Sequence, residues 1–215
     1  MGESGCGKSV TAQCILRLNP EPPGFFEGGE ILYKGQDVLK MSKKEIRKIR
    51  GREIGFVFQD PMTSLNPTMR VGAQIEEVFI GRAGVSKKEV KEKALEIMKL
   101  VGISDVEKRY RQYPHELSGG QLQRVCIARA VACEPQLILF DEAISSLDAH
   151  TQVQVMDLLM ELKDQLGLTY VFITHDLTSV TYLCDQVLFL YKGRSRNISR
   201  WRRLRRHLTH TQKNF

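Results

Sequence analysis

The pattern of apolar and polar positions predicts strands that alternate with helices along the chain. Short apolar runs predict buried β-strands at residues 54–58, 137–140, 169–174 and 186–191. Apolar residues recur every three or four positions from Val90 to Val101 and from Val155 to Leu166, and this spacing predicts amphipathic helices. The alternation indicates an α/β domain, in which a mainly parallel sheet carries helices on both faces.

Two further segments add to this plan. Residues 25–38 hold a short hairpin pattern bounded by glycines. Residues 60–135 hold helical patterns, including one from Val71 to Ile80, and predict a helical subdomain inserted into the α/β domain. Serine followed three residues later by glutamate predicts capped helix starts at Ser42 and Ser86.

Size and composition fit one globular domain with an insertion. The chain has 215 residues, of which 42% are hydrophobic. It contains no run of eighteen uncharged apolar residues and no signal-peptide pattern, so we expect any membrane role to depend on a partner. The five cysteines are scattered and form no C-x-x-C pair, which fits a reducing compartment and argues against a zinc site or a disulfide framework.

The net charge of +7 comes from the end of the chain. Residues 194–215 hold eight Lys or Arg and no acid, so residues 1–193 hold 24 basic and 25 acidic side chains. The body is therefore close to neutral, and its charge does not predict binding to nucleic acid. For residues 194–215 we predict a disordered basic tail; the alternative is an amphipathic helix on an anionic membrane surface, with Ile198, Trp201, Leu204 and Leu208 on one side.

The start of the chain fits the phosphate-loop pattern G-x-x-x-x-G-K-[ST], with Gly2, Gly7, Lys8 and Ser9 at the defined positions. Glycines allow the backbone N–H groups to surround phosphates, while the lysine reaches the terminal phosphates and the serine ligates magnesium. A helical pattern follows at residues 12–16, as such a loop requires.

A second set of candidate residues follows from Ser118. This serine can cap a helix whose first N–H groups, at Gly119 and Gly120, suit an anion such as phosphate. About twenty residues later, Asp141 and Glu142 end a buried strand and suit a magnesium site and a base for water. Each feature alone fits a capped helix or a solvated strand end, but together they indicate a nucleotide site.

The wording YPHELSGGQLQR, followed by LILFDE and SSLD, resembles the ATP-binding subunit of an ABC transporter, in particular its peptide and nickel importer branch. The resemblance covers about Gly2 to Gly193. It implies a P-loop NTPase fold with a remnant antiparallel hairpin, ATP and Mg²⁺ as cofactors, and hydrolysis coupled to import. It also implies three kinds of partner: a second ATP-binding subunit, transmembrane permease subunits and, without direct contact, a substrate-binding protein. Nucleic acid is not among the implied partners. The implied position is peripheral, on the cytoplasmic face of the membrane.

The same resemblance implies a role for each motif residue. ATP would contact the phosphate loop of one subunit and the LSGGQ residues of the other, at Gly2, Glu3, Ser4, Gly5, Cys6, Gly7, Lys8, Ser9, Ser118, Gly119, Gly120 and Gln121. Ser9 and Gln59 would hold magnesium, with Asp141 acting through water. Glu142 would polarise the attacking water, Gln59 would contact it, and His175 would steady the γ-phosphate. Asp148 would belong to a loop that communicates across the dimer.

The chain departs from the family at both ends. The family has two or three strands and an adenine-stacking aromatic before the phosphate loop, where this sequence has only Met1. We therefore expect a truncated chain that binds ATP weakly, and an inactive remnant is the strongest alternative. A non-transport ABC ATPase would carry a long coiled coil or zinc cysteines, and a small-molecule P-loop kinase would lack LSGGQ.

Overall fold

A computed structural model describes the chain except residues 2–4, 81–85 and 201–215, and the side chains of residues 196–200. Its central sheet is parallel and has the strand order β3-β4-β5. The strands of the described residues are β1 Leu32–Tyr33, β2 Gln36–Asp37, β3 Ile54–Val57, β4 Leu137–Asp141, β5 Thr169–Ile173, β6 Gln186–Tyr191 and β7 Arg194–Arg200.

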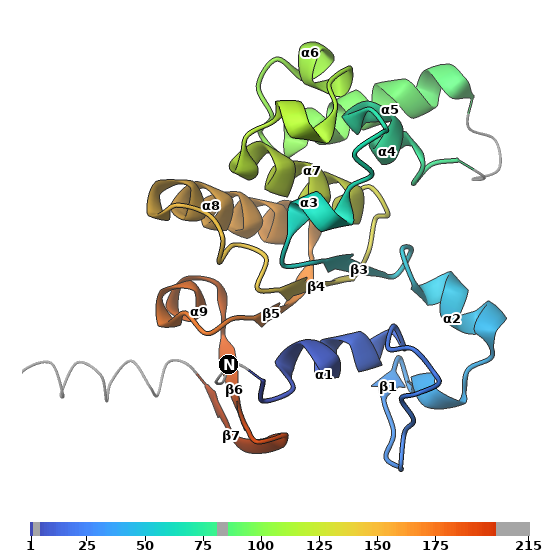
Figure 1. The fold of residues 1–215 in the computed structure, drawn as a ribbon, viewed down its shortest axis with the longest axis vertical. Helices are drawn as coiled ribbons and strands as arrows, with labels where there is room; N and C mark the ends of the chain where they lie inside the picture. The colour runs from blue at the N-terminus through green and yellow to red at the C-terminus, as the bar shows by residue number, and fades with distance from the viewer. Residues whose placement is uncertain (2–4, 81–85, 201–215) are drawn as a thin grey trace, which may run out of the picture.

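The helices surround this sheet. They are α1 Lys8–Ile15, α2 Lys43–Ile49, α3 Pro61–Ser64, α4 Val71–Glu76, α5 Lys87–Leu100, α6 Val106–Tyr110, α7 Gly119–Val131, α8 Ala149–Leu166 and α9 Leu177–Leu183, with 3₁₀ turns η1 Val38–Lys40 and η2 Pro114–Glu116. In Figure 1, α7 and α8 lie above the sheet, while α1 and α9 lie below it. The predicted α/β fold, with helices on both faces of a parallel sheet, is confirmed.

The predicted helix caps are present. The side chains of Ser42, Ser86 and Ser118 each accept a hydrogen bond from the backbone three residues on, in a complete capping box. The α8 helix, predicted from the pattern between Val155 and Leu166, ends at Gly167, which has a left-handed φ of 64°. Each cap satisfies backbone groups that a helix end leaves without partners, worth about 1 kcal/mol.

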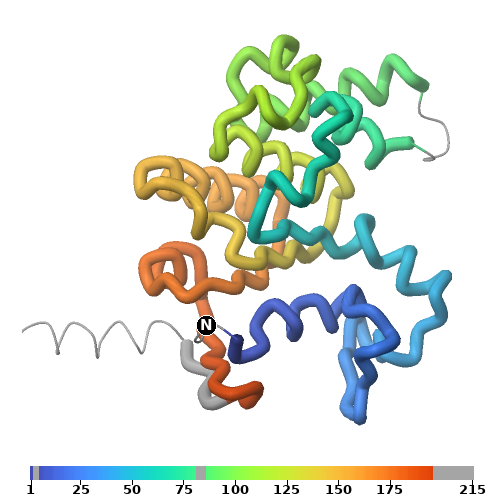
Figure 2. Tube along the Cα trace, in the orientation of Figure 1, coloured from blue at the N-terminus to red at the C-terminus, as the bar shows by residue number. Residues whose placement is uncertain are grey.

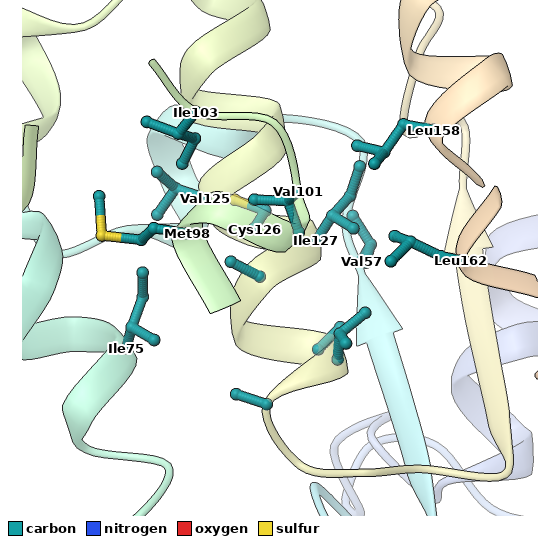
Figure 3. Close-up of a cluster of buried hydrophobic side chains, with 14 of the residues drawn as sticks. Val57, Ile75, Met98, Val101, Ile103, Val125, Cys126, Ile127, Leu158 and Leu162 are labelled. Atoms are coloured by element: carbon teal, nitrogen blue, oxygen red, sulfur yellow. The ribbon is translucent and has the colours of Figure 1, made fainter. Parts of the chain in front are cut away.

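The helical segment between β3 and β4 packs on the sheet through one hydrophobic core. Figure 3 shows Met98 of α5 and Ile75 of α4 on the side of Val125 of α7, and Val57 of β3 beside Ile127 of α7. These side chains are almost completely buried. Truncation of one of them, such as Met98→Ala, would cost about 2–5 kcal/mol.

A second apolar cluster holds the chain start against the other face of the sheet. Leu16, after α1, packs with Ile46 of α2 and with Leu139 of β4. The predicted hairpin is present as β1 and β2, which pair antiparallel through two residues each, and Lys34 and Gly35 turn between them with positive φ. This arrangement fixes α1, and with it the residues that follow the phosphate loop, below β4.

The C-terminal strands correct two predictions. We expected residues 186–191 in the parallel sheet, but β6 pairs antiparallel with β7 in a separate two-stranded sheet. We expected disorder from Arg194, but Arg194–Arg200 forms β7, and residues 201–215 lie outside the described part. A β-ladder is made of hydrogen bonds between main-chain groups, so it does not require apolar side chains. The polar, arginine-rich segment Arg194–Arg200 can therefore pair with β6.

Two predicted strands are also less buried than expected. Phe58 lies just after β3 rather than inside it and is 41% exposed, and its ring centroid lies 4.4 Å from that of Phe56 with the rings tilted by 37°. In β5, Thr169 and Val171 are exposed while Ile173 is buried. β5 is the edge strand of the three-stranded sheet.

Candidate active site

The predicted polar residues meet where the three parallel strands end. Gln59 follows β3, Glu142 follows β4 and His175 follows β5. The Gln59 amide donates a hydrogen bond of 3.3 Å to one Glu142 oxygen, and His175 Nδ1 lies 3.5 Å from the other. Lys8 Nζ lies 3.7 Å from that second oxygen. Glu142 is therefore the centre of a cluster drawn from all three strand ends and from α1.

The backbone of Glu142 is held in an unusual conformation. Its φ is 47°, in the left-handed region that non-glycine residues seldom adopt. Its N–H donates to the Ile173 carbonyl at 2.9 Å, and its own carbonyl accepts from the Ser145 hydroxyl at 2.7 Å. These bonds offset a strain of about 1–3 kcal/mol and aim the carboxylate at Lys8, Gln59 and His175.

The start of α1 contributes the groups of the site that would contact phosphate. Gly7 has φ 96° and precedes the helix, and no side chain caps the helix start. The first N–H groups of α1 are thus suited to an anionic ligand. Lys8 is buried, and the Ser9 hydroxyl donates a hydrogen bond of 2.8 Å to Asp141. Of the remaining predicted loop residues, Gly5 and Cys6 precede this turn, whereas Gly2, Glu3 and Ser4 lie outside the described residues.

The surroundings of Asp141 raise the pKa of its carboxyl group. Burial raises its pKa, and the nearby Glu142 carboxylate raises it further, while the Ser9 hydrogen bond and Lys8 act in the opposite direction. A cation next to Asp141 would relieve this penalty. The Ser9 hydroxyl, the Gln59 amide oxygen and the Asp141 carboxylate are hard oxygen donors, the type that Mg²⁺ prefers, so the residues fit the ion that the resemblance implies.

The second predicted set of ATP residues lies apart from this cluster. Among the described contacts, no hydrogen bond or ion pair joins Ser118–Gln121 to Glu142, Lys8 or Asp141. Instead, a Cβ atom on Gly120 would lie 2.6 Å from the Thr151 side chain. The turn that contains Asp148, which caps α8 through Thr151, therefore packs against the start of α7. The structure brings Asp148 to the LSGGQ segment, and Gln59, Asp141, Glu142 and His175 to the phosphate loop.

Two features of the site were missed by the sequence analysis. Ser145 fixes the Glu142 backbone, and the signal available was its position three residues after that glutamate, where a serine hydroxyl can reach a carbonyl. The ion pair of Lys8 with Glu142 has no sequence signal, because 134 positions separate the two residues along the chain.

Comparison with known proteins identifies the family. The ABC transporter family model matches residues 1–145. The chain belongs to the ABC transporter family. It is 50% identical over 193 residues to the oligopeptide transport ATP-binding protein OppD of Bacillus subtilis, covering 90% of this chain and 54% of that protein. It is 43% identical to the dipeptide transport ATP-binding protein DppD of the same species, covering 92% and 59%. The chain thus spans little more than half the length of these relatives.

Solved ABC cassettes have the same fold. The dimeric ATP-binding cassette MJ0796, in a post-hydrolysis state bound to ADP and Pi, superposes with a TM-score of 0.80 at 32% identity, over 93% of this chain and 83% of that one. For cbiO1 from Clostridium perfringens, part of an ABC transporter complex, the TM-score is 0.82 at 28% identity, over 99% and 80%. The predicted family and fold are confirmed. Among the described residues of this ABC-family chain, none of the helices is long and apolar enough to cross a membrane.

Proposed function

We propose that this ABC-family chain is an ATP-binding subunit that couples ATP hydrolysis to the import of peptides through separate membrane subunits. The observation that carries the proposal is the cluster at Glu142, where Lys8, Gln59 and His175 converge beside the Ser9–Asp141 pair. The named relatives are transporters of oligopeptides and dipeptides, and this favours peptides over nickel as the cargo.

Phosphate binding would rearrange the ion pair at the centre of the site. Lys8 is buried and pairs with Glu142, but its position at the start of α1 lets its ammonium reach phosphate oxygens together with the first N–H groups of the helix. When Lys8 turns to the phosphates, the Glu142 carboxylate becomes available to a water molecule. The ion pair therefore keeps the base engaged until nucleotide arrives.

The polar groups of the site then have separate roles in hydrolysis, and Gln59 has two. Glu142 accepts a hydrogen bond from the attacking water and polarises it, and Gln59 orients the same water from the end of β3. His175 donates a hydrogen bond to the γ-phosphate. Ser9 and Gln59 would hold Mg²⁺ and Asp141 would bind it through water; the ion supplies neutralisation of the charge on the β- and γ-phosphates.

A complete site needs a second ATP-binding subunit. Among the described contacts of one chain, Ser118–Gln121 share no hydrogen bond or ion pair with Glu142. We therefore propose that they bind the γ-phosphate held by the partner, with Asp148 linking the two sites. The exposed Met62 of α3 is a candidate contact to transmembrane permease subunits. A substrate-binding protein would act on the outer side only indirectly. This places the chain at the cytoplasmic face of the membrane as a peripheral subunit, without a role for nucleic acid.

A domain graft tests the proposal. The 193-residue matched region of OppD is replaced by this chain's region in Bacillus subtilis cells that lack OppD, and uptake of a labelled oligopeptide is measured. We expect uptake to return with the graft and to be lost when the graft carries Lys8→Ala. Lys88→Ala, a lysine-to-alanine change on the exposed face of α5, is the matched control and should keep uptake.

A negative uptake result is informative only if the grafted protein is present in normal amount. A graft that is present at the membrane in normal amount, binds ATP and still restores no uptake would contradict peptide import. Equal ATP affinity of the Lys8→Ala and Lys88→Ala grafts would contradict the assigned phosphate site, because loss of a phosphate contact should weaken binding at least roughly tenfold.

A further inference from the structure

His175 stands in the turn between β5 and α9 with its side chain largely in solvent. The side chain is 61% exposed, and its Nδ1 lies 3.5 Å from a Glu142 oxygen. Figure 2 shows the chain passing from β5 directly into α9, drawn in orange below α8. A side chain with little packing around it keeps much of its rotamer freedom, so its reach is set mainly by its backbone. The residues next to His175 therefore decide where the imidazole can go.

The two neighbours of His175 are joined to each other. The Asp176 N–H donates a hydrogen bond of 2.9 Å to the Thr174 hydroxyl. Thr174 is only 3% exposed, so it gives this bond a fixed support. A threonine hydroxyl that accepts from the backbone two residues on is a common way to fix a tight turn. The His175 backbone is thus held inside a closed turn.

The Asp176 carboxylate ties the same turn to the start of α9. One of its oxygens accepts a hydrogen bond of 3.0 Å from the Thr178 N–H. The other accepts from the Ser179 N–H at 2.8 Å and from the Ser179 hydroxyl at 2.5 Å. Ser179 is 2% exposed. These bonds satisfy N–H groups that a helix start leaves without partners, so Asp176 is an N-cap with both oxygens engaged.

The hydrogen bonds also keep Asp176 ionised. Burial raises the pKa of its carboxyl group, but hydrogen bonds from Ser179 and Thr178 outweigh burial and hold the pKa below its ordinary value. The start of a helix favours a negative charge, and hydrogen bonds to an ionised acceptor are stronger than those to a neutral one. The connection between the His175 turn and α9 is therefore a strong one at neutral pH.

The helix that receives these bonds is itself anchored in the domain. Leu183 of α9 is buried in the same core as Leu158 and Leu159 of α8. The Tyr182 hydroxyl also donates a hydrogen bond to Asp157 of α8. An element fixed by packing can position a side chain more precisely than a free loop can. Asp176 thus connects an exposed histidine to a packed helix.

We propose that Asp176 is a positioning residue for ATP hydrolysis, which holds the turn that presents His175 to the γ-phosphate and acts through that histidine. The inference rests on the proposed function, in which His175 donates a hydrogen bond to the γ-phosphate. Without the carboxylate, the turn loses its connection to Thr178 and Ser179. Because a misplacement of about 1 Å can lower a rate by about a hundredfold, we expect Asp176→Ala to lower kcat at least roughly tenfold.

A double-mutant cycle tests whether Asp176 acts through His175. The kcat of ATP hydrolysis is measured on the purified OppD graft, and urea unfolding on the full chain, for the unmodified protein, Asp176→Ala, His175→Ala and the double variant. Asp176→Ala should lower kcat at least roughly tenfold when His175 is present and by less than about twofold when it is absent. The shift of the urea midpoint should be the same in both backgrounds, because the cap bonds do not involve the imidazole.

Two further variants separate capping from a general loss of stability. Asp176→Asn keeps an acceptor oxygen for the N–H groups of α9, and since Asn caps helices about as well as Asp, kcat should stay within about threefold. Asp37→Ala is the matched control, because Asp37 caps η1 by accepting from the Leu39 N–H at 3.1 Å. It should lower the urea midpoint and leave kcat within about twofold of the unmodified graft.

A variant with a smaller change covers the case in which Asp176→Ala does not fold. Ser179→Ala removes the hydroxyl hydrogen bond to Asp176 and keeps both backbone bonds. It should give a smaller fall in kcat that again depends on the presence of His175. The same cycle is then measured with Ser179→Ala in place of Asp176→Ala.

Two results would overturn the inference. One is an equal fall in kcat with and without His175, which would mean that Asp176 supports the fold as a whole. The other is a kcat for Asp176→Ala as high as that for Asp37→Ala. An unchanged kcat for His175→Ala would contradict the proposed role of His175 as well, so a failure of the proposed function can be told apart from a failure of this inference alone.

Discussion

Neutralising Glu142 should destabilise the nucleotide-free protein through Lys8. The two side chains are only 6% and 17% exposed, and their charged atoms lie 3.7 Å apart. Glu142→Gln keeps the shape and a hydrogen-bond acceptor for Gln59 but takes away one of the two carboxylates near the buried Lys8 ammonium and leaves Asp141. Removing one partner of a buried pair costs more than removing both, because the remaining charge stays desolvated.

The size of the effect follows from the separation. Coulomb's law gives about 4 kcal/mol for unit charges at this distance with an effective dielectric constant of ~20. The atoms lie beyond hydrogen-bond distance, and desolvation opposes the attraction, so we expect a coupling free energy of about 1–2 kcal/mol. For a protein of this size, each kcal/mol shifts the melting temperature by about 2–4 °C.

A double-mutant cycle measures this coupling. Urea unfolding is followed for the wild type, Glu142→Gln, Lys8→Met and the double variant, all without nucleotide. The same cycle with His175→Gln in place of Lys8→Met is the comparison, since His175 is 61% exposed and should couple by less than about 0.5 kcal/mol. Additivity of Glu142→Gln and Lys8→Met within about 0.5 kcal/mol would refute the ion pair as a stabilising contact.

Three further variants test other parts of the structure. Gly72→Ala places a Cβ 2.2 Å from the Tyr110 ring and should cost about 1–3 kcal/mol in urea unfolding, whereas Gly28→Ala, whose Cβ meets open space, should be nearly neutral. Asp141→Asn should stabilise the free protein at neutral pH, because burial raises the pKa of Asp141 and the ionised carboxylate is unfavourable in the fold. The gain should shrink as the pH falls through the raised pKa of Asp141 and should be lost once the pH is below the ordinary carboxyl pKa; an equal gain in thermal unfolding at neutral pH and at that low pH would contradict this. Ser118→Arg should block hydrolysis without weakening ATP binding to the monomer, and an equal loss of both would show that the serine does not act on the partner's nucleotide.

Much of the fold could be predicted from local pattern. Ser42 and Ser118 cap helices because a serine followed by Glu or Gln three residues later satisfies two backbone donors by itself. The runs at β3 and β4 are apolar because both faces of those strands are buried. The pairing of β6 with β7 could not be predicted, because backbone ladders accept the polar residues of Arg194–Arg200 as readily as apolar ones.

The residues of the candidate site could be predicted from the sequence, but most of the contacts between them could not. Gln59, Glu142 and His175 each follow a predicted parallel strand, so their meeting at one sheet edge follows from topology. The engagement of Glu142 by Lys8 depends on how α1 packs below β4, and the left-handed backbone of Glu142 depends on Ser145. The first of these cannot be derived from spacing along the chain, whereas the second has a local signal in the position of Ser145 three residues after Glu142.

The proposed mechanism is tested most directly by ATP hydrolysis of the purified OppD graft that carries Glu142→Gln. ATP binding is measured in the same preparation. We predict that turnover falls to background while ATP affinity is at least as high as that of the unmodified graft, because the change removes the base, leaves the phosphate contacts of Lys8 in place and removes the ion pair that competes with them. Glu92→Gln, on the exposed face of α5, is the matched control and should hydrolyse ATP like the unmodified graft. Hydrolysis by the Glu142→Gln graft at the unmodified rate would contradict the assignment of Glu142 and, with it, the proposed mechanism.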